Sequence, residues 1–253
     1  MTAVSTFDGH QAVWSGRLGS LRNTVRQHVV REQLHSHLDG VTSALDVGCG
    51  QGTQAVELAA RGIRVTGVDP APELLALLAA SARARGCAVE TVPGSLADLE
   101  RLLDGRAFDL VCAHGLLMYL PDARAALATL GGLVRAGGLV SFTVRNGDAL
   151  AFRPGVRGDW PAALAAYDAT TYTNELGASA TAHRLADVLD WCDELGLDVE
   201  GWYGVRVLTD GVPAGAPPDP DTLAACLAAE VEAGRREPYR RFGSQLHVIA
   251  RKR

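Results

Sequence analysis

The chain has 253 residues, of which 47% are hydrophobic and 21% are charged. This length and balance fit one large globular domain, or one domain with appendages, and they exclude an intrinsically disordered chain. The formal net charge of −5 at pH 7 speaks against a broadly basic surface for nucleic acids, although it leaves room for a local basic patch.

Membrane, secreted and metal-binding proteins are also disfavoured. No stretch of 18 apolar residues is present, so we expect no membrane span. Residues 1–8 lack the basic start and apolar stretch of a secretion signal, and we expect a cytoplasmic protein. The five cysteines show neither a Cys-x-x-Cys motif nor a zinc-like spacing with histidine, which predicts free thiols and no metal site.

The spacing of apolar residues predicts a helix over about residues 10–39, followed by alternating strands and helices. The strands are expected at 44–47, 63–68, 87–92, 108–113 and 139–144, and the helices at 53–61, 72–85, 95–103 and 122–134. This alternation indicates an α/β fold, a Rossmann-like parallel sheet with helices on both faces. Right-handed crossovers bring the carboxyl ends of such strands to one edge, here with Gly48, Asp69, Asp98 and His114.

The pattern changes at Arg145. Residues 145–181 combine glycines, prolines and scattered aromatic residues, which predicts a lid or a binding segment without regular structure. The elements expected after it are a helix at 182–195, a strand at 197–208, a linker at 212–220, a helix at 222–234 and a strand at 244–251. We expect the two late strands at the sheet edge, with the last one antiparallel.

A glycine-rich turn follows the first strand. Gly48 and Gly50 allow a ligand to approach the backbone, and Gly52 allows the next helix to approach the strand. Cys49 between them is interpreted as a small residue that fills the tight turn. Asp69 ends the second strand, where a carboxylate accepts hydrogen bonds from the two hydroxyls of an adenosine ribose.

Two cofactors compete for this turn. Nicotinamide dinucleotides prefer the spacing Gly-x-Gly-x-x-Gly, whose helix N-terminus faces a pyrophosphate. Here the glycines are spaced Gly-x-Gly-x-Gly, and Asp46 precedes them. The Asp46 carboxylate repels a pyrophosphate but attracts a sulfonium or an ammonium group. The residues therefore favour S-adenosylmethionine over a nicotinamide dinucleotide.

These residues resemble the class I S-adenosylmethionine-dependent methyltransferases. The resemblance rests on LDVGCGQG at 45–52, FDLV at 108–111 and LVRAGG at 133–138. It implies a seven-stranded, mostly parallel sheet with an antiparallel last strand. It also implies that residues 41–253 form the methyltransferase domain, that 1–40 are a helical segment covering the cofactor, and that 145–181 are a lid or an acceptor-binding insertion.

A narrower resemblance to the bacterial tRNA 5-carboxymethoxyuridine methyltransferases runs nearly end to end. It is carried by GSLR at 19–22, AHGLL at 113–117, Asn146, GVRV at 204–207, REPY at 236–239 and HVIARK at 247–252. The resemblance implies that Arg22 binds the cofactor carboxylate, that Gly48 and Cys49 lie beside its methionine part, and that Asp69 binds its ribose. Ala97 and Asp98 are then expected at the adenine, and His114 beside both cofactor and acceptor.

The chain departs from that family on the expected RNA side. Ser244 and Gln245 replace an arginine and a tyrosine, residues 179–184 replace a proline-rich basic stretch, and 145–181 lack a run of lysines. Phosphate contacts supply most nucleic-acid affinity, so each departure weakens the expectation of tRNA. A modified tRNA base and a small molecule both stay open as the acceptor.

Candidate acceptor-binding residues follow the fifth strand and lie near the C-terminus. Arg145 and Arg206 suit a carboxylate or a phosphate, because a guanidinium group binds such anions with paired hydrogen bonds. Tyr172 suits stacking on an aromatic acceptor. Asn146 and Tyr239 belong to the stretches shared with the tRNA family.

His114 has two interpretations, a packed histidine or a catalytic base or donor at the acceptor. The leading hypothesis is a methyltransferase that acts on an oxygen nucleophile such as a carboxylate and releases S-adenosylhomocysteine. The alternatives are a small-molecule methyltransferase of the same fold, a non-catalytic S-adenosylmethionine-binding protein and a nicotinamide-dependent oxidoreductase. The sequence leaves open whether the chain forms a homodimer.

Overall fold

The computed structural model describes residues 19–173, 177–212 and 215–253, so residues 10–18 of the first predicted helix lie outside it. The chain divides into two compact units. Unit 2 comprises residues 34–144, 186–202 and 247–253, and unit 1 comprises the described residues within 1–33, 145–185 and 203–246. The division of the chain at residue 40 into an N-terminal helical segment and a methyltransferase domain stays a prediction.

Unit 2 contains the alternating strands and helices that the sequence predicts. Its strands are β1 (Ser43–Val47), β2 (Arg64–Asp69), β3 (Val89–Pro93), β4 (Phe108–Ala113), most of β5 (Val134–Asn146), and parts of β8 (Leu197–Val205) and β9 (Gln245–Lys252). Its helices are α3 (Thr53–Ala59), α4 (Pro72–Ala84), α5 (Leu99–Leu103), α6 (Ala123–Gly132) and most of α9 (Leu185–Glu194), with the 3-10 turns η1 (Leu96–Asp98) and η2 (Leu117–Tyr119).

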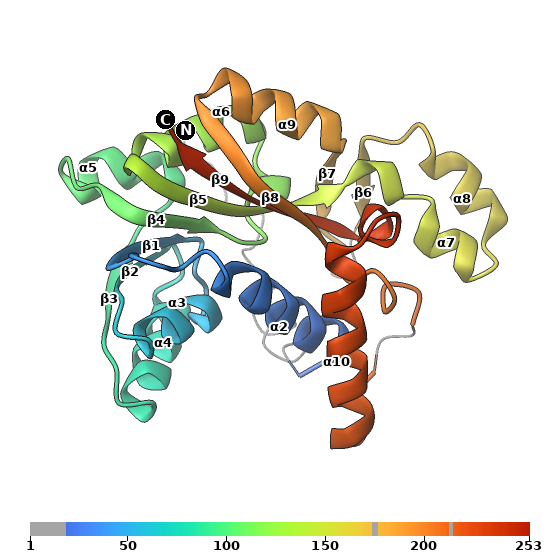
Figure 1. Cartoon of the computed structure of the whole chain (residues 1–253), viewed down its shortest axis with the longest axis horizontal. Helices are drawn as coiled ribbons and strands as arrows, with labels where there is room; N and C mark the ends of the chain where they lie inside the picture. Colours follow the sequence, from blue (N-terminus) through green and yellow to red (C-terminus); the bar gives the residue numbers. More distant parts are fainter. Residues whose placement is uncertain (1–18, 174–176, 213–214) are drawn as a thin grey trace. The chain divides into compact units, whose positions relative to one another are not determined.

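The order β3-β2-β1-β4-β5 is parallel throughout, as the predicted crossovers require. Every residue of β1 is buried, because helices cover the sheet from both sides. Figure 1 shows α3 and α4 on one face of this sheet and α6 and α9 on the other. The mostly parallel α/β fold predicted from the sequence is thereby confirmed.

Unit 1 is built from segments far apart in the sequence. It contains most of α2 (Leu21–His35), α7 (Phe152–Val156), α8 (Trp160–Ala166), the hairpin of β6 (Thr171–Thr173) and β7 (Ser179–His183), α10 (Pro220–Arg235), and the turns η3 (Gly147–Ala149) and η4 (Tyr239–Phe242). One buried cluster links α2 to β8 through Val25, Val29, Val30 and Val205. Leu227 and Val231 of α10 pack against it.

Residues 145–181 are more regular than the predicted irregular segment. The side chain of Asp159 caps α8, and a proline occupies its first turn. The helix predicted from 182 begins only at Leu185, because Ser179–His183 forms strand β7. The strands β6 and β7 raise the count among the described residues to nine, against the seven expected, and their pair is antiparallel. Strand β9 pairs with both β5 and β8, so it has a partner on each side and is not itself an edge strand.

None of the described helices is long and apolar enough to cross a membrane.

Candidate active-site residues

The glycine turn between β1 and α3 has the backbone that its glycines permit. Gly48, Gly50 and Gly52 all have positive φ, at 68°, 54° and 82°. A Cβ on Gly52 would lie 2.3 Å from Cγ of Leu78, whereas a Cβ on Gly50 would meet nothing within 4 Å. Gly52 thus permits the close packing of α4, and Gly50 leaves space at the turn.

Asp69 ends β2 and binds the same turn. Its Oδ2 accepts a hydrogen bond from the amide of Gly50 at 2.8 Å, and its Oδ1 accepts one from the amide of Ala71 at 3.0 Å. A carboxylate has about four acceptor positions, so both oxygens retain capacity for ribose hydroxyls. Burial raises the pKa of Asp69, and the two amides oppose that shift.

Asp46 is almost completely buried at the end of β1. Burial, with the nearby charge of Asp69, raises the pKa of Asp46 to about 7. Neither carboxylate takes part in an ion pair among the described residues. A pair of buried carboxylates in this state fits a cationic ligand, because a positive group nearby would stabilise their charged forms.

Cys49 is a packed thiol. Its Sγ lies 3.7 Å from the carbonyl oxygen of Gly50, and it would be 3.0 Å from a Cβ on Gly67. Burial, together with the charges of Asp46 and Asp69, raises the pKa of the Cys49 thiol. The thiol therefore stays protonated, which agrees with its interpretation as a small residue filling the turn.

Asp98 forms a capping box at the start of η1. Its Oδ2 accepts hydrogen bonds from the amide and the hydroxyl of Ser95, and its Oδ1 accepts one from Arg101. These bonds to Ser95 and Arg101 lower the pKa of Asp98 to about 2. Ala97 is exposed beside it. The structure brings both residues to the end of β3 and leaves their predicted contact with adenine a prediction.

His114 follows β4 and is partly buried. Its Nε2 lies 2.9 Å from Oγ of Ser141, and the same hydroxyl lies 2.8 Å from Nε2 of the fully buried His247. The next amide, that of Gly115, donates to Oγ1 of Thr143 at 2.7 Å. Both interpretations of His114 thus meet a definite side-chain partner, the hydroxyl of Ser141.

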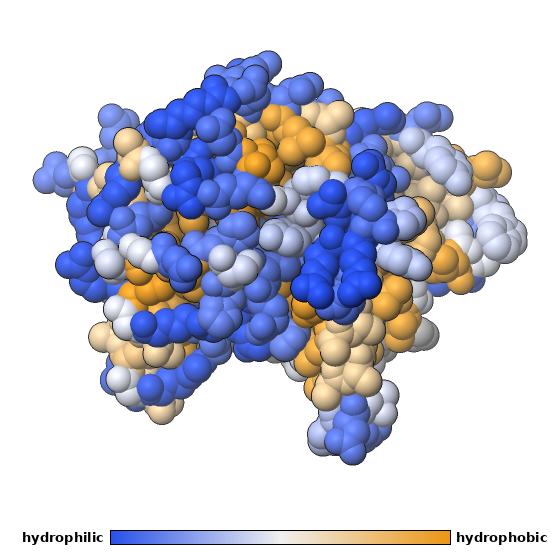
Figure 2. Space-filling view, in the orientation of Figure 1, coloured by the Kyte–Doolittle hydropathy of each residue, from blue (hydrophilic) through white to orange (hydrophobic). Residues whose placement is uncertain are grey.

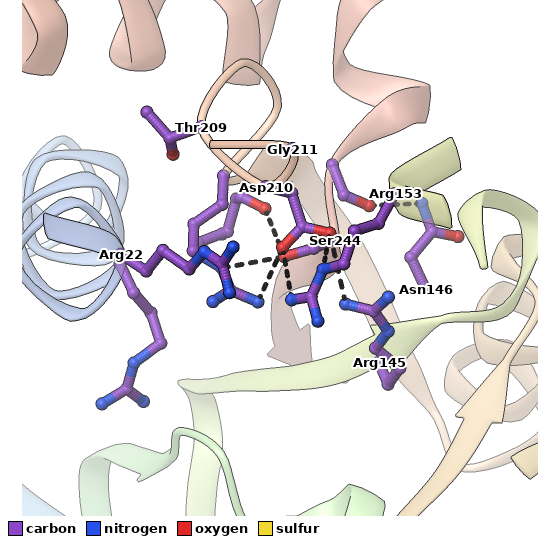
Figure 3. Close-up of polar contacts among 12 residues, drawn as sticks. Arg22, Arg145, Asn146, Arg153, Thr209, Asp210, Gly211 and Ser244 are labelled. Carbon is purple, nitrogen blue, oxygen red and sulfur yellow. Dashed lines mark hydrogen bonds and ion pairs between the residues drawn. The ribbon is translucent and has the colours of Figure 1, made fainter. Parts of the chain in front are cut away.

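In unit 1, three guanidinium groups surround the buried carboxylate of Asp210 (Figure 3). Arg153 binds it through two hydrogen bonds of 3.0 and 2.8 Å, and a nitrogen of Arg206 lies 3.2 Å away. A nitrogen of Arg145 lies at 4.0 Å. Burial alone would raise the pKa of Asp210, but these arginines outweigh it, and the pKa is lowered.

Arg145 is the most buried cation of this cluster, with 4% of its side chain exposed. Its guanidinium carbon lies 4.7 Å from the centre of the Tyr172 ring. Among the described residues its Nε has no hydrogen-bond partner. Burial lowers the pKa of Arg145, and it outweighs the attraction of Asp210; repulsion by Arg206 and Arg153 adds to the lowering.

Arg206 is positioned by the turn after β8. Its φ is 55°, a left-handed value that is uncommon outside glycine. The turn is stabilised by the buried carboxylate of Glu230, which accepts hydrogen bonds from three successive amides, those of Val207, Leu208 and Thr209. The Nε of Arg206 then donates to Oγ of Ser244 at 2.9 Å. The hydrogen bonds to Glu230 offset the backbone strain at Arg206. The turn that they stabilise places the Arg206 guanidinium group beside Asp210.

The other residues predicted at the cofactor or the acceptor have different surroundings. Arg22 is buried in unit 1 and donates through Nε to the carbonyl oxygen of Val212 at 3.1 Å. The amide nitrogen of Asn146 donates to the carbonyl oxygens of Arg241 and Gly243, so this side chain supports the local backbone. Tyr239 is 54% exposed in η4.

Figure 2 shows a strongly hydrophilic patch where α10 ends and η4 begins. Its arginines are paired with acids of the same segment: Arg235 and Arg236 with Glu232, and Arg240 and Arg241 with Glu237. The four cations therefore share their charge with two carboxylates.

The sequence did not predict site roles for four residues, two in the cluster around Asp210 and two beside His114. Arg153 and Asp210 carried no motif, and their 57-residue separation matches no local pattern. Ser141 is one of several small residues in a strand, and His247 was noted only within a stretch shared with a family. Alternation along β5 is the one signal that places Ser141 and Thr143 on a common face.

Comparisons with known proteins agree with this geometry. A family model described as a methyltransferase domain matches residues 44–138. The tRNA 5-carboxymethoxyuridine methyltransferase of Escherichia coli K12 is 27% identical over 243 residues, which cover 92% of this chain and 90% of that protein. A ubiquinone biosynthesis O-methyltransferase of a Methylobacterium species is 32% identical over 54% of this chain and 59% of its own length.

Solved structures share the fold. Magnesium protoporphyrin IX methyltransferase from Synechocystis, crystallised with S-adenosylhomocysteine, has a TM-score of 0.65 over 98% of this chain and 96% of that chain, at 15% identity. A second crystal structure of that protein contains S-adenosylmethionine. The glycine turn, the two buried carboxylates beside it and the matched domain lead to one conclusion: residues 44–138 lie in a methyltransferase domain, and S-adenosylmethionine is its methyl donor.

Proposed function

We propose that this enzyme methylates an oxygen of an anionic acceptor, namely a carboxylate. The observation that carries the proposal is the cluster around Asp210 in unit 1, where guanidinium groups outnumber carboxylates among the described residues. Three guanidinium groups surround one carboxylate, and the most buried of them retains an Nε without a partner among the described residues. Buried charge that is not balanced is costly, so a bound anion would stabilise this cluster.

Arg145 and Arg206 are the proposed ligands of the acceptor carboxylate. Arg145 contributes its free Nε, and Arg206 is held in position by Ser244 and Asp210. Tyr172 lies against Arg145 and suits an unsaturated part of the acceptor. Tyr239 is accessible and stays a candidate, whereas the amide of Asn146 serves the backbone around it.

The cofactor residues in this proposal belong mainly to unit 2. Asp69 would accept the ribose hydroxyls, Asp46 would face a cationic group, and Gly48 to Gly50 would allow close approach. Ala97 and Asp98 stay candidates for the adenine, and Arg22 for the cofactor carboxylate. S-adenosylmethionine supplies a methyl group that is already activated by a positively charged sulfur.

The protein's own contribution to methyl transfer is position and exclusion of water. A carboxylate acceptor needs no base, because its oxygen is already a nucleophile. The role of His114 is then to donate a hydrogen bond to the acceptor, or to accept a proton if the acceptor is a hydroxyl.

Two acceptors fit this chemistry. The end-to-end likeness to the Escherichia coli protein supports a carboxymethoxyuridine in tRNA. The pairing of the exposed arginines near η4 with Glu232 and Glu237 favours a small carboxylic acid instead, because fewer free cations remain for phosphates. Acidic residues also outnumber lysine and arginine in the whole chain, 29 to 24.

The test is a turnover assay with radiolabelled methyl donor against total tRNA that lacks the methyl ester, and against a metabolite extract enriched in carboxylic acids. We expect a labelled product that mild alkali hydrolyses, as it does esters. Asp69→Ala should abolish labelling, and the matched variant Asp104→Ala, at an exposed turn, should not. An alkali-stable product from the wild-type enzyme would contradict a carboxylate acceptor.

A further inference from the structure

A buried hydroxyl connects two histidines in unit 2. Ser141 lies on β5 with no exposed surface, and its Oγ is within hydrogen-bond distance of Nε2 of His114 and Nε2 of His247. His247, on β9, is also fully buried, and the two rings meet edge to face with centroids 5.2 Å apart. The described residues offer this hydroxyl no third hydrogen-bond partner.

The hydroxyl has a single hydrogen, and this limits the two rings. The O–H of Ser141 donates to one of the two Nε2 atoms, because a buried donor without an acceptor is costly. The other Nε2 must then carry a hydrogen and donate to Oγ. When both rings are neutral, one histidine is therefore protonated on Nε2 and the other on Nδ1. Changing one ring's tautomer requires changing the other's.

We propose that Ser141 and His247 are positioning residues that set which nitrogen of His114 carries the proton. If the O–H points to His114, its Nδ1 is a hydrogen-bond donor. If the O–H points to His247, the Nδ1 of His114 is a base. This inference rests on the proposed role of His114, and it names the two residues that choose between its two forms.

The surroundings keep this arrangement rigid. Cys112 of β4 pairs in register with Ser141 of β5, so the loop after β4 begins beside this hydroxyl. Thr143, two residues along β5, binds the amide of Gly115 and thus holds the residue after His114. Burial, with the nearby His114, keeps the pKa of His247 well below its usual value, so His247 stays neutral and takes only one hydrogen.

The first test reads tautomers by ¹⁵N-edited spectra of protein labelled at histidine, at a pH where both rings are neutral. His114→Gln and His247→Gln assign the two signals, and His35→Gln, at an exposed position, is the matched control. We expect opposite tautomers in the wild type and a changed, mixed signal for His114 in Ser141→Ala. The same tautomer for both rings, or an unchanged His114 signal in Ser141→Ala, would overturn the inference.

The second test is kinetic, with the acceptor that the turnover assay identifies. We expect Ser141→Ala to lower kcat about tenfold or more, because a misdirected histidine loses much of its general acid–base or donor contribution. The Kd for S-adenosylhomocysteine should stay within about twofold, which shows an intact fold, and Ser141→Thr should recover most of the loss. A normal kcat in Ser141→Ala, alongside a low kcat in His114→Gln, would refute the positioning role.

The two tests separate this inference from the proposed function. If no carboxylic acid is methylated, the proposed function fails while the spectra still decide the tautomers. If His114→Gln retains full turnover, the role of His114 fails, and the positioning role fails with it.

Discussion

At the scale of single residues, the features that matter are charges held out of water. Asp46 and Asp69 end neighbouring strands of unit 2 as buried carboxylates, and burial raises the pKa of both. In the described part of unit 1 the cluster around Asp210 has the opposite sign, since Arg145, Arg153 and Arg206 surround this one carboxylate. Uncompensated buried charge lowers the stability of the free protein, so each cluster suits a ligand of opposite sign.

Asp46→Asn is expected to stabilise the free protein and weaken cofactor binding. In the folded wild type Asp46 has a pKa of about 7, well above its ordinary value. Between these two values the folded state holds a proton that the unfolded state has lost, so stability falls as pH rises toward 7 and then levels off. At pH 8 the variant should be more stable by about 1–4 kcal/mol. Its Kd for S-adenosylmethionine should rise about tenfold or more.

Urea unfolding at pH 5 and pH 8 measures the first effect, and titration calorimetry measures the second. The difference in stability between the wild type and the variant should be largest at pH 8 and clearly smaller at pH 5, since it disappears only below the ordinary pKa of the carboxyl. Equal pH dependence of the two proteins would show that Asp46 does not carry the shifted proton.

Arg145→Gln should raise the KM for the acceptor about 10- to 100-fold and leave the Kd for S-adenosylhomocysteine unchanged, because a charge-assisted hydrogen bond contributes about 1.5–3 kcal/mol. Removing this cation also lessens the excess of buried positive charge, so the fold should be retained. Arg235→Gln is the matched control, since Arg235 is exposed and paired with Glu232. Steady-state kinetics with both variants decide this point; similar KM values would remove Arg145 from the acceptor site.

At the scale of elements, the glycine turn contains a position where glycine is needed for two reasons, the positive φ of its backbone and the close packing of a helix. Gly52 has a φ of 82°, and α4 approaches it so closely that Leu78 occupies the space of a Cβ. Gly62 has nearly the same φ, 84°, with open space around it. A comparison of Gly52 with Gly62 therefore separates the free-energy cost of a side chain at positive φ from the cost of its contact with Leu78.

Gly52→Ala should therefore destabilise the protein by about 2–5 kcal/mol, which combines the strain of a positive φ with overpacking. Gly62→Ala should cost only about 1 kcal/mol, from the strain alone. Thermal and urea unfolding measure both. In a double-mutant cycle, Gly52→Ala together with Leu78→Ala should destabilise the protein by less than the sum of the two single changes, because the smaller residue at 78 makes room for the added methyl group. Additive effects would mean that Leu78 is not the residue in the way.

At the scale of the whole molecule, the chain contains two compact units that interleave in sequence. The proposed cofactor residues, Arg22 apart, lie in unit 2, and the proposed acceptor residues, His114 apart, lie in unit 1. Packing groups the described residues 19–33 with 145–185 and 203–246 in unit 1. We infer that the units divide the two binding tasks.

Hydrogen exchange tests this division. S-adenosylhomocysteine should slow exchange most at residues 46–52 and 69–71 of unit 2, where amides of Gly50 and Ala71 bind Asp69. The identified acceptor should slow exchange most at residues 206–210 of unit 1. Both patterns should exceed the general protection that any ligand of the folded state confers. Protection of the same residues by both ligands would contradict separate binding tasks.

The sequence by itself determined the α/β fold, most element positions in unit 2 and the glycine turn with Asp46 and Asp69. These signals are local, because helical spacing, strand burial and turn residues all act within a few positions of the chain. Tertiary structure alone decided the two polar clusters. Arg153 meets Asp210 across 57 positions, and Ser141 meets His247 across 106. Packing sets such contacts, and no spacing rule connects residues so far apart, so the charges and tautomers that result depend on the folded protein.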